Sequence, residues 1–256
     1  MQEPAVRIIA RPIAAGIMRF TELEERMPGS PALPLTIDVI SDVVCPWCYI
    51  GKRRLEAALA LVAQEGAAGE VSVRWHPFEL NPELPAAGLD RRAYLEAKFG
   101  GPERAAEIYE RIREAGVTVG IPFALDRIAR QPNTRDAHRL VAWSQARGNA
   151  EPLVERLFAA YFLEGRNPGE RDVLAAIAGE AGEDPAAARA MLESGEGRDA
   201  VEASERRAQE IGIGGVPFFI FNGRLAVSGV QEPRVLAQAM AEAAKAGTAG
   251  NAAAGY

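Results

Sequence analysis

The sequence predicts an α/β fold in which a large all-helical insertion separates a βαβ half from a ββα half. Residues 35–78 carry two strand patterns with a helical pattern between them. Residues 89–211 carry helical patterns and almost no strand pattern, and a stretch of this length is far too long for a loop. Two short strand patterns and an amphipathic helix follow, so we expect the α/β fold to resume after the insertion.

The βαβ half is predicted from residues 35–40, 52–64 and 70–78. The first segment is an apolar run, the second has helical periodicity, and the third alternates polar and apolar side chains. A helix that crosses over between two strands implies that these strands pair in parallel.

A Cys-Pro-Trp-Cys motif lies where the first strand pattern gives way to the first helix. A C-x-x-C at this place is typical of a thioredoxin-like redox motif. If the helix begins at Cys45, its dipole places partial positive charge on that sulfur and favours the thiolate. Pro46 suits the first helical position, where its missing N–H costs nothing. Cys48 lies one turn further on the same face, close enough to form a disulfide with Cys45.

The chain contains only two cysteines, which restricts what else this motif could be. A structural disulfide across so short a loop would add little entropic stabilisation. A zinc site needs two more ligands, and His76 and His138 lie at no recognised spacing from the pair. We therefore expect redox exchange and no bound metal. A zinc-binding or chaperone-like module that uses Cys45, Cys48 and His76 stays as an alternative.

The insertion, residues 83–211, is predicted to consist of amphipathic helices. Asn133 or Thr134 suits the N-cap of one of them. The positions that form stripes at helical spacing are Ala137, Leu140 and Val141, then Leu153, Val154, Leu157, Phe158, Tyr161 and Phe162, and finally Val201, Ser204, Ala208 and Ile211.

The ββα half is predicted to begin after the insertion, at residue 212. A strand follows Pro217 directly, and Asn222-Gly223 is a strong hairpin signal before the return strand at residues 224–228. The closing helix carries its apolar stripe at Val235, Leu236, Ala239, Met240 and Ala243.

These patterns divide the chain into one domain, one insertion and two ends. Residues 35–82 and 212–246 form the α/β domain. Residues 1–34 are an N-terminal extension, and residues 247–256, rich in Ala and Gly, are a frayed tail.

Composition and charge exclude several classes of function. The chain is 48% hydrophobic and 25% charged, as in ordinary globular proteins, and its formal charge is −6. A net negative charge argues against a nucleic-acid partner or an anionic membrane surface. The apolar piece near the N-terminus is interrupted by Arg11 and Pro12 and makes a poor signal peptide, so we expect a cytoplasmic protein.

The chain resembles the DsbA-like thioredoxin family, and within it the FrnE-like branch, over about residues 35–246. The stretches that carry the resemblance are Cys45-Pro46-Trp47-Cys48-Tyr49-Ile50-Gly51, Pro77-Phe78-Glu79-Leu80-Asn81-Pro82, Asn133-Thr134 with Ala137-His138-Arg139-Leu140, Gly215-Val216-Pro217-Phe218-Phe219, and Val227-Ser228-Gly229 with Gln231. The resemblance implies a thioredoxin fold with a helical insertion and a thiol–disulfide oxidoreductase that exchanges disulfides through its dithiol.

The resemblance also implies roles for individual residues. Cys45 is the attacking nucleophile and Cys48 the resolving thiol. Pro217 is a cis-proline that faces the disulfide, and the backbone of Val216 pairs with an extended substrate segment. The partners are then protein or small-molecule thiols and disulfides, for a monomer or a homodimer.

Three further residues have a functional and a structural interpretation. Trp47, which with Pro46 replaces the Pro-His of strongly oxidising relatives, is either an exposed apolar platform for a partner or packs on the insertion. Asn81 either orders the mouth of the cleft or only makes an Asn-Pro turn. His138 lies on a predicted helix with apolar neighbours, where a satisfied structural histidine is favoured over a proton shuttle.

The main alternative is a glutathione-dependent isomerase or transferase of the same superfamily, such as hydroxychromene-carboxylate isomerase. Those relatives typically carry a single Ser where Cys45 stands, and a Ser-Asp pair that binds glutathione. Here Ser228-Gly229-Val230-Gln231 occupies that region and no Asp follows. We expect no tightly bound cofactor, and glutathione remains open as a co-substrate.

Overall fold

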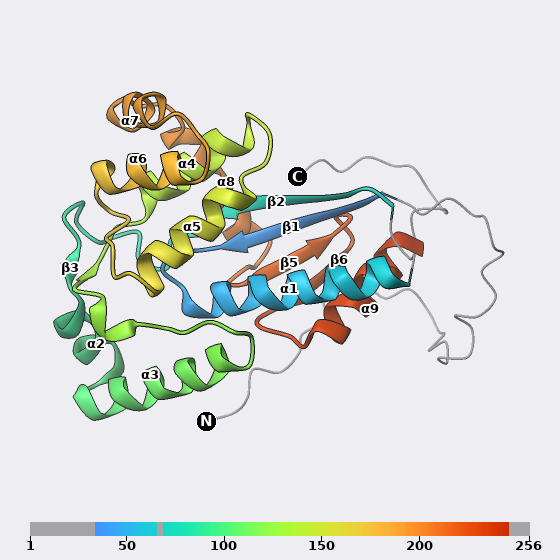
Figure 1. Ribbon diagram of the computed structural model, residues 1–256, viewed down its shortest axis with the longest axis horizontal. Helices are drawn as coiled ribbons and strands as arrows, with labels where there is room; N and C mark the ends of the chain where they lie inside the picture. Colours follow the sequence, from blue (N-terminus) through green and yellow to red (C-terminus); the bar gives the residue numbers. More distant parts are fainter. Residues whose placement is uncertain (1–33, 66–68, 246–256) are drawn as a thin grey trace.

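A four-stranded sheet forms the centre of the protein (Figure 1). The computed structural model describes residues 34–65 and 69–245. The strands are β1 (Leu35–Ser41), β2 (Val71–Pro77), β5 (Phe218–Phe221) and β6 (Leu225–Ser228), in the spatial order β2-β1-β5-β6. The predicted N-terminal extension lies outside the described residues except for its last residue, and the predicted tail lies wholly outside them.

The pairing of the strands follows the predicted βαβ and ββα halves. β1 and β2 are parallel, from Leu35 opposite Val71 to Ser41 opposite Pro77, and helix α1 (Pro46–Gln64) connects them. β5 is antiparallel to β1, and β6 is antiparallel to β5. The crossover rule therefore predicted the right orientation for the first two strands.

The two faces of the sheet are covered by different helices. Ile37 and Val39 of β1 belong to the main core, which also holds residues of α1 and of α9 (Pro233–Lys245). Figure 1 shows α1 and α9 side by side along this face. Ile40 belongs to a smaller cluster with Ala208 of α8 (Arg198–Glu210) on the other face. This alternation is what the pleat of a strand requires.

The chain between β2 and β5 is helical apart from one short strand pairing. Its helices are α2 (Arg91–Phe99), α3 (Pro102–Val117), α4 (Arg135–Gln145), α5 (Glu151–Phe162), α6 (Arg171–Glu180), α7 (Pro185–Glu193) and α8, with a 3₁₀ turn at Leu125–Arg127. The strands β3 (Leu89–Asp90) and β4 (Arg130–Gln131) pair antiparallel. Two residues are too few for a visible alternation, so no sequence pattern indicated these strands.

The insertion packs directly on the first turns of α1. The Tyr49 ring stacks on Phe158 of α5 with 5.0 Å between the ring centroids, and its hydroxyl donates to Glu155 Oε1 at 2.9 Å. Tyr49 follows Cys48 in the sequence, so the insertion is held against the part of α1 that carries the Cys-Pro-Trp-Cys motif. Among the described helices, none has both the length and the apolar character needed to span a membrane.

Candidate active site

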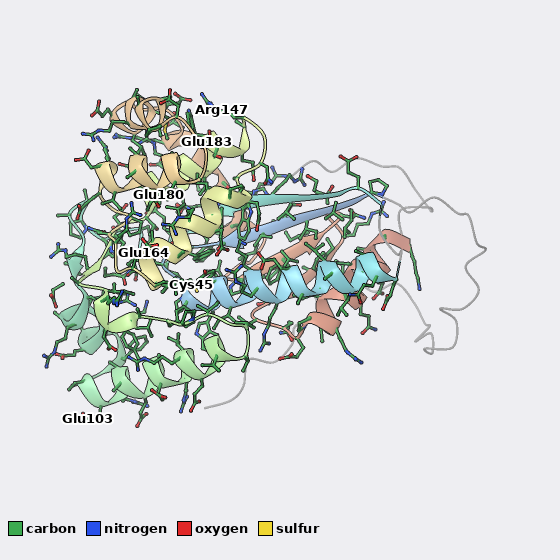
Figure 2. All side chains as sticks on the ribbon, in the orientation of Figure 1. Cys45, Glu103, Arg147, Glu164, Glu180 and Glu183 are labelled. Atoms are coloured by element: carbon green, nitrogen blue, oxygen red, sulfur yellow. The ribbon has the colours of Figure 1, made fainter. Side chains whose placement is uncertain are left out.

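Cys45 lies at the start of α1, after the end of β1 (Figure 2), and Cys48 lies in the first turn of the helix. Cys45 is the N-cap residue, with φ −91° and ψ 112°, and Pro46 is the first helical residue. The Cys48 N–H donates to the Cys45 carbonyl oxygen at 3.0 Å, which closes the first turn. Both cysteines are free thiols, exposed by only 4% and 2%. Cys45 therefore lies at the N-terminal end of α1, where the helix dipole places partial positive charge.

The loop before β5 completes the surroundings of Cys45. The Val216–Pro217 peptide bond is cis, as the family resemblance implies. The Cys45 thiol donates to the Val216 carbonyl oxygen, with 3.8 Å between Sγ and the oxygen. The structure thus brings together Cys45 and Val216, which are 171 positions apart in the chain.

Gly51 allows the cis-proline loop to approach α1. A Cβ atom at this position would lie 2.9 Å from Pro217 Cγ and 3.3 Å from Phe219 Cζ. Gly51 is one turn beyond Cys48 on the same helix, so any side chain there would push the Pro217 loop away from the thiols. Gly51 belongs to the motif read from the sequence but had no predicted role, because only the folded structure shows which segment it contacts.

Burial raises the pKa of the Cys48 thiol well above its ordinary value, and the neighbouring Cys45 adds to this rise. Hydrogen bonds from the Ser41 side chain and the Asp42 backbone act in the opposite direction. Cys48 therefore holds its proton in the reduced protein and must lose it before it can act as a nucleophile.

Of three other residues named from the sequence, two belong to the Cys-Pro-Trp-Cys motif and the third lies in the loop after β2. Trp47 is 38% exposed, so of its two interpretations the structure favours the apolar platform. Pro46 is half-buried beside it. Asn81 Oδ1 accepts a hydrogen bond from the Tyr94 hydroxyl of α2 at 2.6 Å. Asn81 therefore ties the loop after β2 to the insertion.

A buried pair of polar residues lies behind the motif. Asp42 is fully buried, and its Oδ2 accepts from the Leu80 backbone N–H at 2.8 Å. His138 of α4 is 4% exposed, and its Nε2 lies 3.5 Å from Asp42 Oδ1. This Nε2 has no hydrogen-bond partner among the described residues. His138 is therefore buried on α4, as predicted for a structural histidine, and its Nε2 faces Asp42 Oδ1 in an ion pair rather than in a well-aligned hydrogen bond.

Ser41 and Asp42 had no role predicted from the sequence. The signal that could have found them was two polar residues interrupting an apolar run immediately before the cysteine motif. Such residues are expected to be hydrogen-bonded when buried, so their presence marks a polar site within the core.

His76 occupies a different environment from the one that a shared zinc site would need. Its Nε2 lies 2.7 Å from Asp38 Oδ1, and Arg74 binds the same carboxylate. Within residues 34–65 and 69–245, no three His, Cys, Asp or Glu side chains are grouped as a metal site.

A dithiol at the N-terminus of a helix, facing a cis-proline loop that leads into an inner strand of a mixed sheet, defines a protein of the thioredoxin class. The model of the DsbA-like thioredoxin domain matches residues 36–241, and the chain belongs to this family.

Individual relatives show how far the similarity extends. The chain is similar to a probable DsbA oxidoreductase, SCO1869, from Streptomyces coelicolor, with 32% identity, a TM-score of 0.74, and coverage of 82% of this chain and 89% of that one. It is 28% identical to YwbO of Bacillus subtilis over 82% of this chain and 97% of that protein. The structure of the cytosolic disulfide reductase DsbM from Pseudomonas aeruginosa with GSH shares the fold, at 24% identity, a TM-score of 0.54, and coverage of 83% and 98%. These findings support an enzyme of the disulfide oxidoreductase or isomerase kind.

Proposed function

We propose that this protein is a thiol–disulfide oxidoreductase that exchanges disulfides through Cys45 and Cys48. The observation that carries the proposal is the asymmetry of the two thiols. Both thiols are buried, but Cys45 caps the helix and contacts the Val216 carbonyl oxygen, whereas Cys48 lies within the first turn of α1, where burial raises the pKa of its thiol. One thiol is thus placed to meet a substrate, and the other to meet only Cys45.

The exchange has two steps. The Cys45 thiolate attacks one sulfur of a substrate disulfide, which forms a mixed disulfide and releases the other substrate sulfur as a thiol. Cys48 then loses its proton and attacks Cys45 Sγ, which forms the Cys45–Cys48 disulfide and releases the second substrate thiol. The reverse sequence oxidises a substrate dithiol. The reduction potential of the pair relative to its surroundings decides the direction.

Substrate binding is assigned to the surface around Cys45. The backbone beside Val216 would pair with an extended substrate segment, as a strand added to an edge does. The half-buried Pro46 and the exposed ring of Trp47 would pack against its apolar side chains. Asn81 would order the mouth of this surface through its bond with Tyr94.

Glutathione is proposed as the small-molecule partner, and the cytoplasm as the location. The similarity to DsbM, described as a cytosolic disulfide reductase with GSH, supports both choices. A cysteine, rather than a serine, at position 45 supports exchange over glutathione-dependent isomerisation.

Two variants test the proposal. Cys45→Ser should abolish the reduction of glutathione disulfide and of insulin. Cys48→Ser should still react once with a disulfide but retain the substrate, and so accumulate a mixed disulfide that is visible on a non-reducing gel. A Cys48→Ser protein that forms no adduct, or a Cys45→Ser protein that keeps its activity, would contradict the mechanism. Equilibration of the wild-type protein with glutathione buffers would then give its potential.

A further inference from the structure

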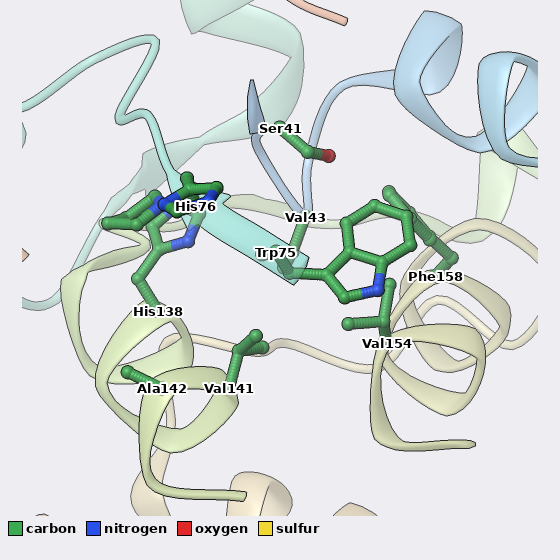
Figure 3. A pocket seen from close by; sticks show the side chains of 10 residues that line it. Ser41, Val43, Trp75, His76, His138, Val141, Ala142, Val154 and Phe158 are labelled. Atoms are coloured by element: carbon green, nitrogen blue, oxygen red, sulfur yellow. The ribbon is translucent and has the colours of Figure 1, made fainter. Parts of the chain in front are cut away.

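A small cavity lies between the sheet and the insertion. Its volume is about 20 Å³, and Ser41, His76 and His138 are among its lining residues (Figure 3). The rest of the wall is mostly apolar, with Trp75 and Phe158 the largest side chains. A cavity of this size holds about one water molecule when two or more polar groups line it.

His138 brings a buried imidazole to this cavity. Its Nε2 lies 3.5 Å from Asp42 Oδ1 but makes no well-aligned hydrogen bond among the described residues. Buried polar atoms are usually fully hydrogen-bonded, so an incompletely bonded imidazole in the core calls for a reason.

Charged groups from three elements surround His138. Asp42 faces it from the loop between β1 and α1, Glu79 from the loop after β2, and Glu205 from α8. Arg135 binds Glu79 Oε1 at 2.9 Å and offsets part of that charge. Burial disfavours the charged ring, but the three carboxylates outweigh it and raise the pKa of His138 above its ordinary value. In its neutral form this imidazole is therefore a stronger base than an ordinary histidine.

Cys48 needs such an acceptor. It must lose a proton before it attacks Cys45 Sγ, and it is buried away from solvent. The Ser41 side chain is near enough to the Cys48 thiol to lower its pKa, and Ser41 lines the cavity that His138 also lines. A hydroxyl both donates and accepts, so Ser41 can pass a proton from the thiol toward the cavity.

We propose that His138, held by Asp42, takes up the proton of Cys48 through Ser41 and the cavity when Cys48 resolves a mixed disulfide. This inference rests on the proposed function. The Cys48 proton moves to His138, the Cys48 thiolate attacks Cys45 Sγ, and the substrate sulfur leaves with the electron pair of the broken bond. In the reverse direction, His138 returns the proton to Cys48 as the Cys45–Cys48 disulfide opens. His138 acts through Ser41 and does not touch the reacting sulfurs.

Rapid mixing of the reduced protein with a limiting amount of dithiobis(nitrobenzoate) tests the proposal. The wild type should release the coloured thiol twice, first when Cys45 attacks and again when Cys48 resolves. In His138→Gln we expect the first phase to be unchanged and the second to be roughly a hundredfold slower at pH 7. The two proteins should converge at high pH, where hydroxide removes the Cys48 proton. Ser41→Ala should slow the same phase.

The other histidine provides a matched control. His76 also lines the cavity, but its Nε2 contacts Asp38 Oδ1 at 2.7 Å. We expect His76→Gln to leave both phases unchanged. A second phase as fast in His138→Gln as in the wild type at every pH would overturn the relay. A wild type that releases only one thiol would overturn the proposed dithiol exchange itself, whatever His138 does.

If His138→Gln does not fold, a measurement on the wild type tests whether His138 shares a proton path with Cys48. The chain has only two histidines, so their ring signals can be followed by NMR as the pH changes. If His138 shares a proton path with Cys48, its titration should differ between the reduced protein and the disulfide form, and the titration of His76 should not. Identical His138 titrations in the two forms would contradict the proposal.

Discussion

At the scale of single residues, the site depends on how closely the loop before β5 approaches helix α1. Cys45, Cys48 and Gly51 lie at the start of α1, and Pro217 from the loop before β5 packs against Gly51. The Cys45 thiol reaches the Val216 carbonyl oxygen because the loop that carries Val216 packs directly against α1. Gly51 is the residue that permits this contact, since a Cβ atom there would lie 2.9 Å from Pro217 Cγ.

We expect Gly51→Ala to displace the Pro217 loop and to slow disulfide exchange. Overpacking of this kind costs about 1–3 kcal/mol of unfolding free energy. Gly179→Ala is a matched control, because Gly179 is also helical and its Cβ would meet Pro185 only at 3.4 Å or more. In an open helical site alanine is favoured over glycine by about 1 kcal/mol. Urea unfolding and exchange rates should therefore separate the two variants, and equal behaviour would show that the close contact with Pro217 does not limit the size of residue 51.

At the scale of elements, ion pairs as well as stacked aromatic rings hold α1 against α5. Lys52 is 3% exposed and contacts Glu151 at 2.7 Å and Glu155 at 2.9 Å, both from α5. Burial disfavours the charged ammonium, but these carboxylates and Glu56 raise the pKa of Lys52 above its ordinary value. The lysine therefore stays charged and links the motif-bearing helix to the insertion.

We expect Lys52→Met to lower the free energy of unfolding by about 1–3 kcal/mol, because it removes the buried cation from Glu151 and Glu155, of which Glu155 keeps Arg53 as a partner. Lys98→Met is the matched control: Lys98 is exposed on α2, and the loss of its contacts should cost less than about 1 kcal/mol. Urea denaturation of both variants checks the difference. A Lys52→Met protein no less stable than Lys98→Met would show that the cluster adds nothing to the junction.

At the scale of the whole molecule, local patterns in the sequence revealed the elements but not the contacts between distant ones. The crossover helix predicted the parallel pairing of β1 with β2, and the Asn222-Gly223 turn predicted the hairpin of β5 and β6. The dithiol followed from two cysteines at a strand–helix junction. The contact of Gly51 with Pro217, the Asp42–His138 pair and the Lys52 cluster each join residues far apart in sequence, and no local periodicity encodes them. The β3–β4 pair was missed because it is too short to show a pattern.

Stability at acidic pH also depends on contacts between residues that are far apart in the sequence. Asp38 of β1 is buried, which by itself would raise its pKa, but His76 and Arg74 of β2 outweigh burial and hold the pKa of Asp38 below its ordinary value. Burial would likewise raise the pKa of Asp136 on α4, but the hydrogen bonds and charges of Arg171 and Arg139 outweigh it and lower that pKa. These carboxylates join strand to strand and helix to helix, so their protonation weakens the fold in several places at once.

The sign of the effect follows from proton linkage. A carboxylate with a lowered pKa contributes stability above its unfolded-state pKa of about 4, and this contribution is lost as the pH falls through its folded-state pKa. We therefore expect the free energy of unfolding to fall steadily below about pH 4. Asp38→Asn should be less stable than the wild type at pH 7. It should also lose less stability on acidification, because an asparagine side chain takes up no proton in this pH range. Urea denaturation at a series of pH values measures both slopes. If Asp38→Asn and the wild type lose stability in parallel below about pH 4, the contact with Arg74 and His76 is not a source of the acid sensitivity.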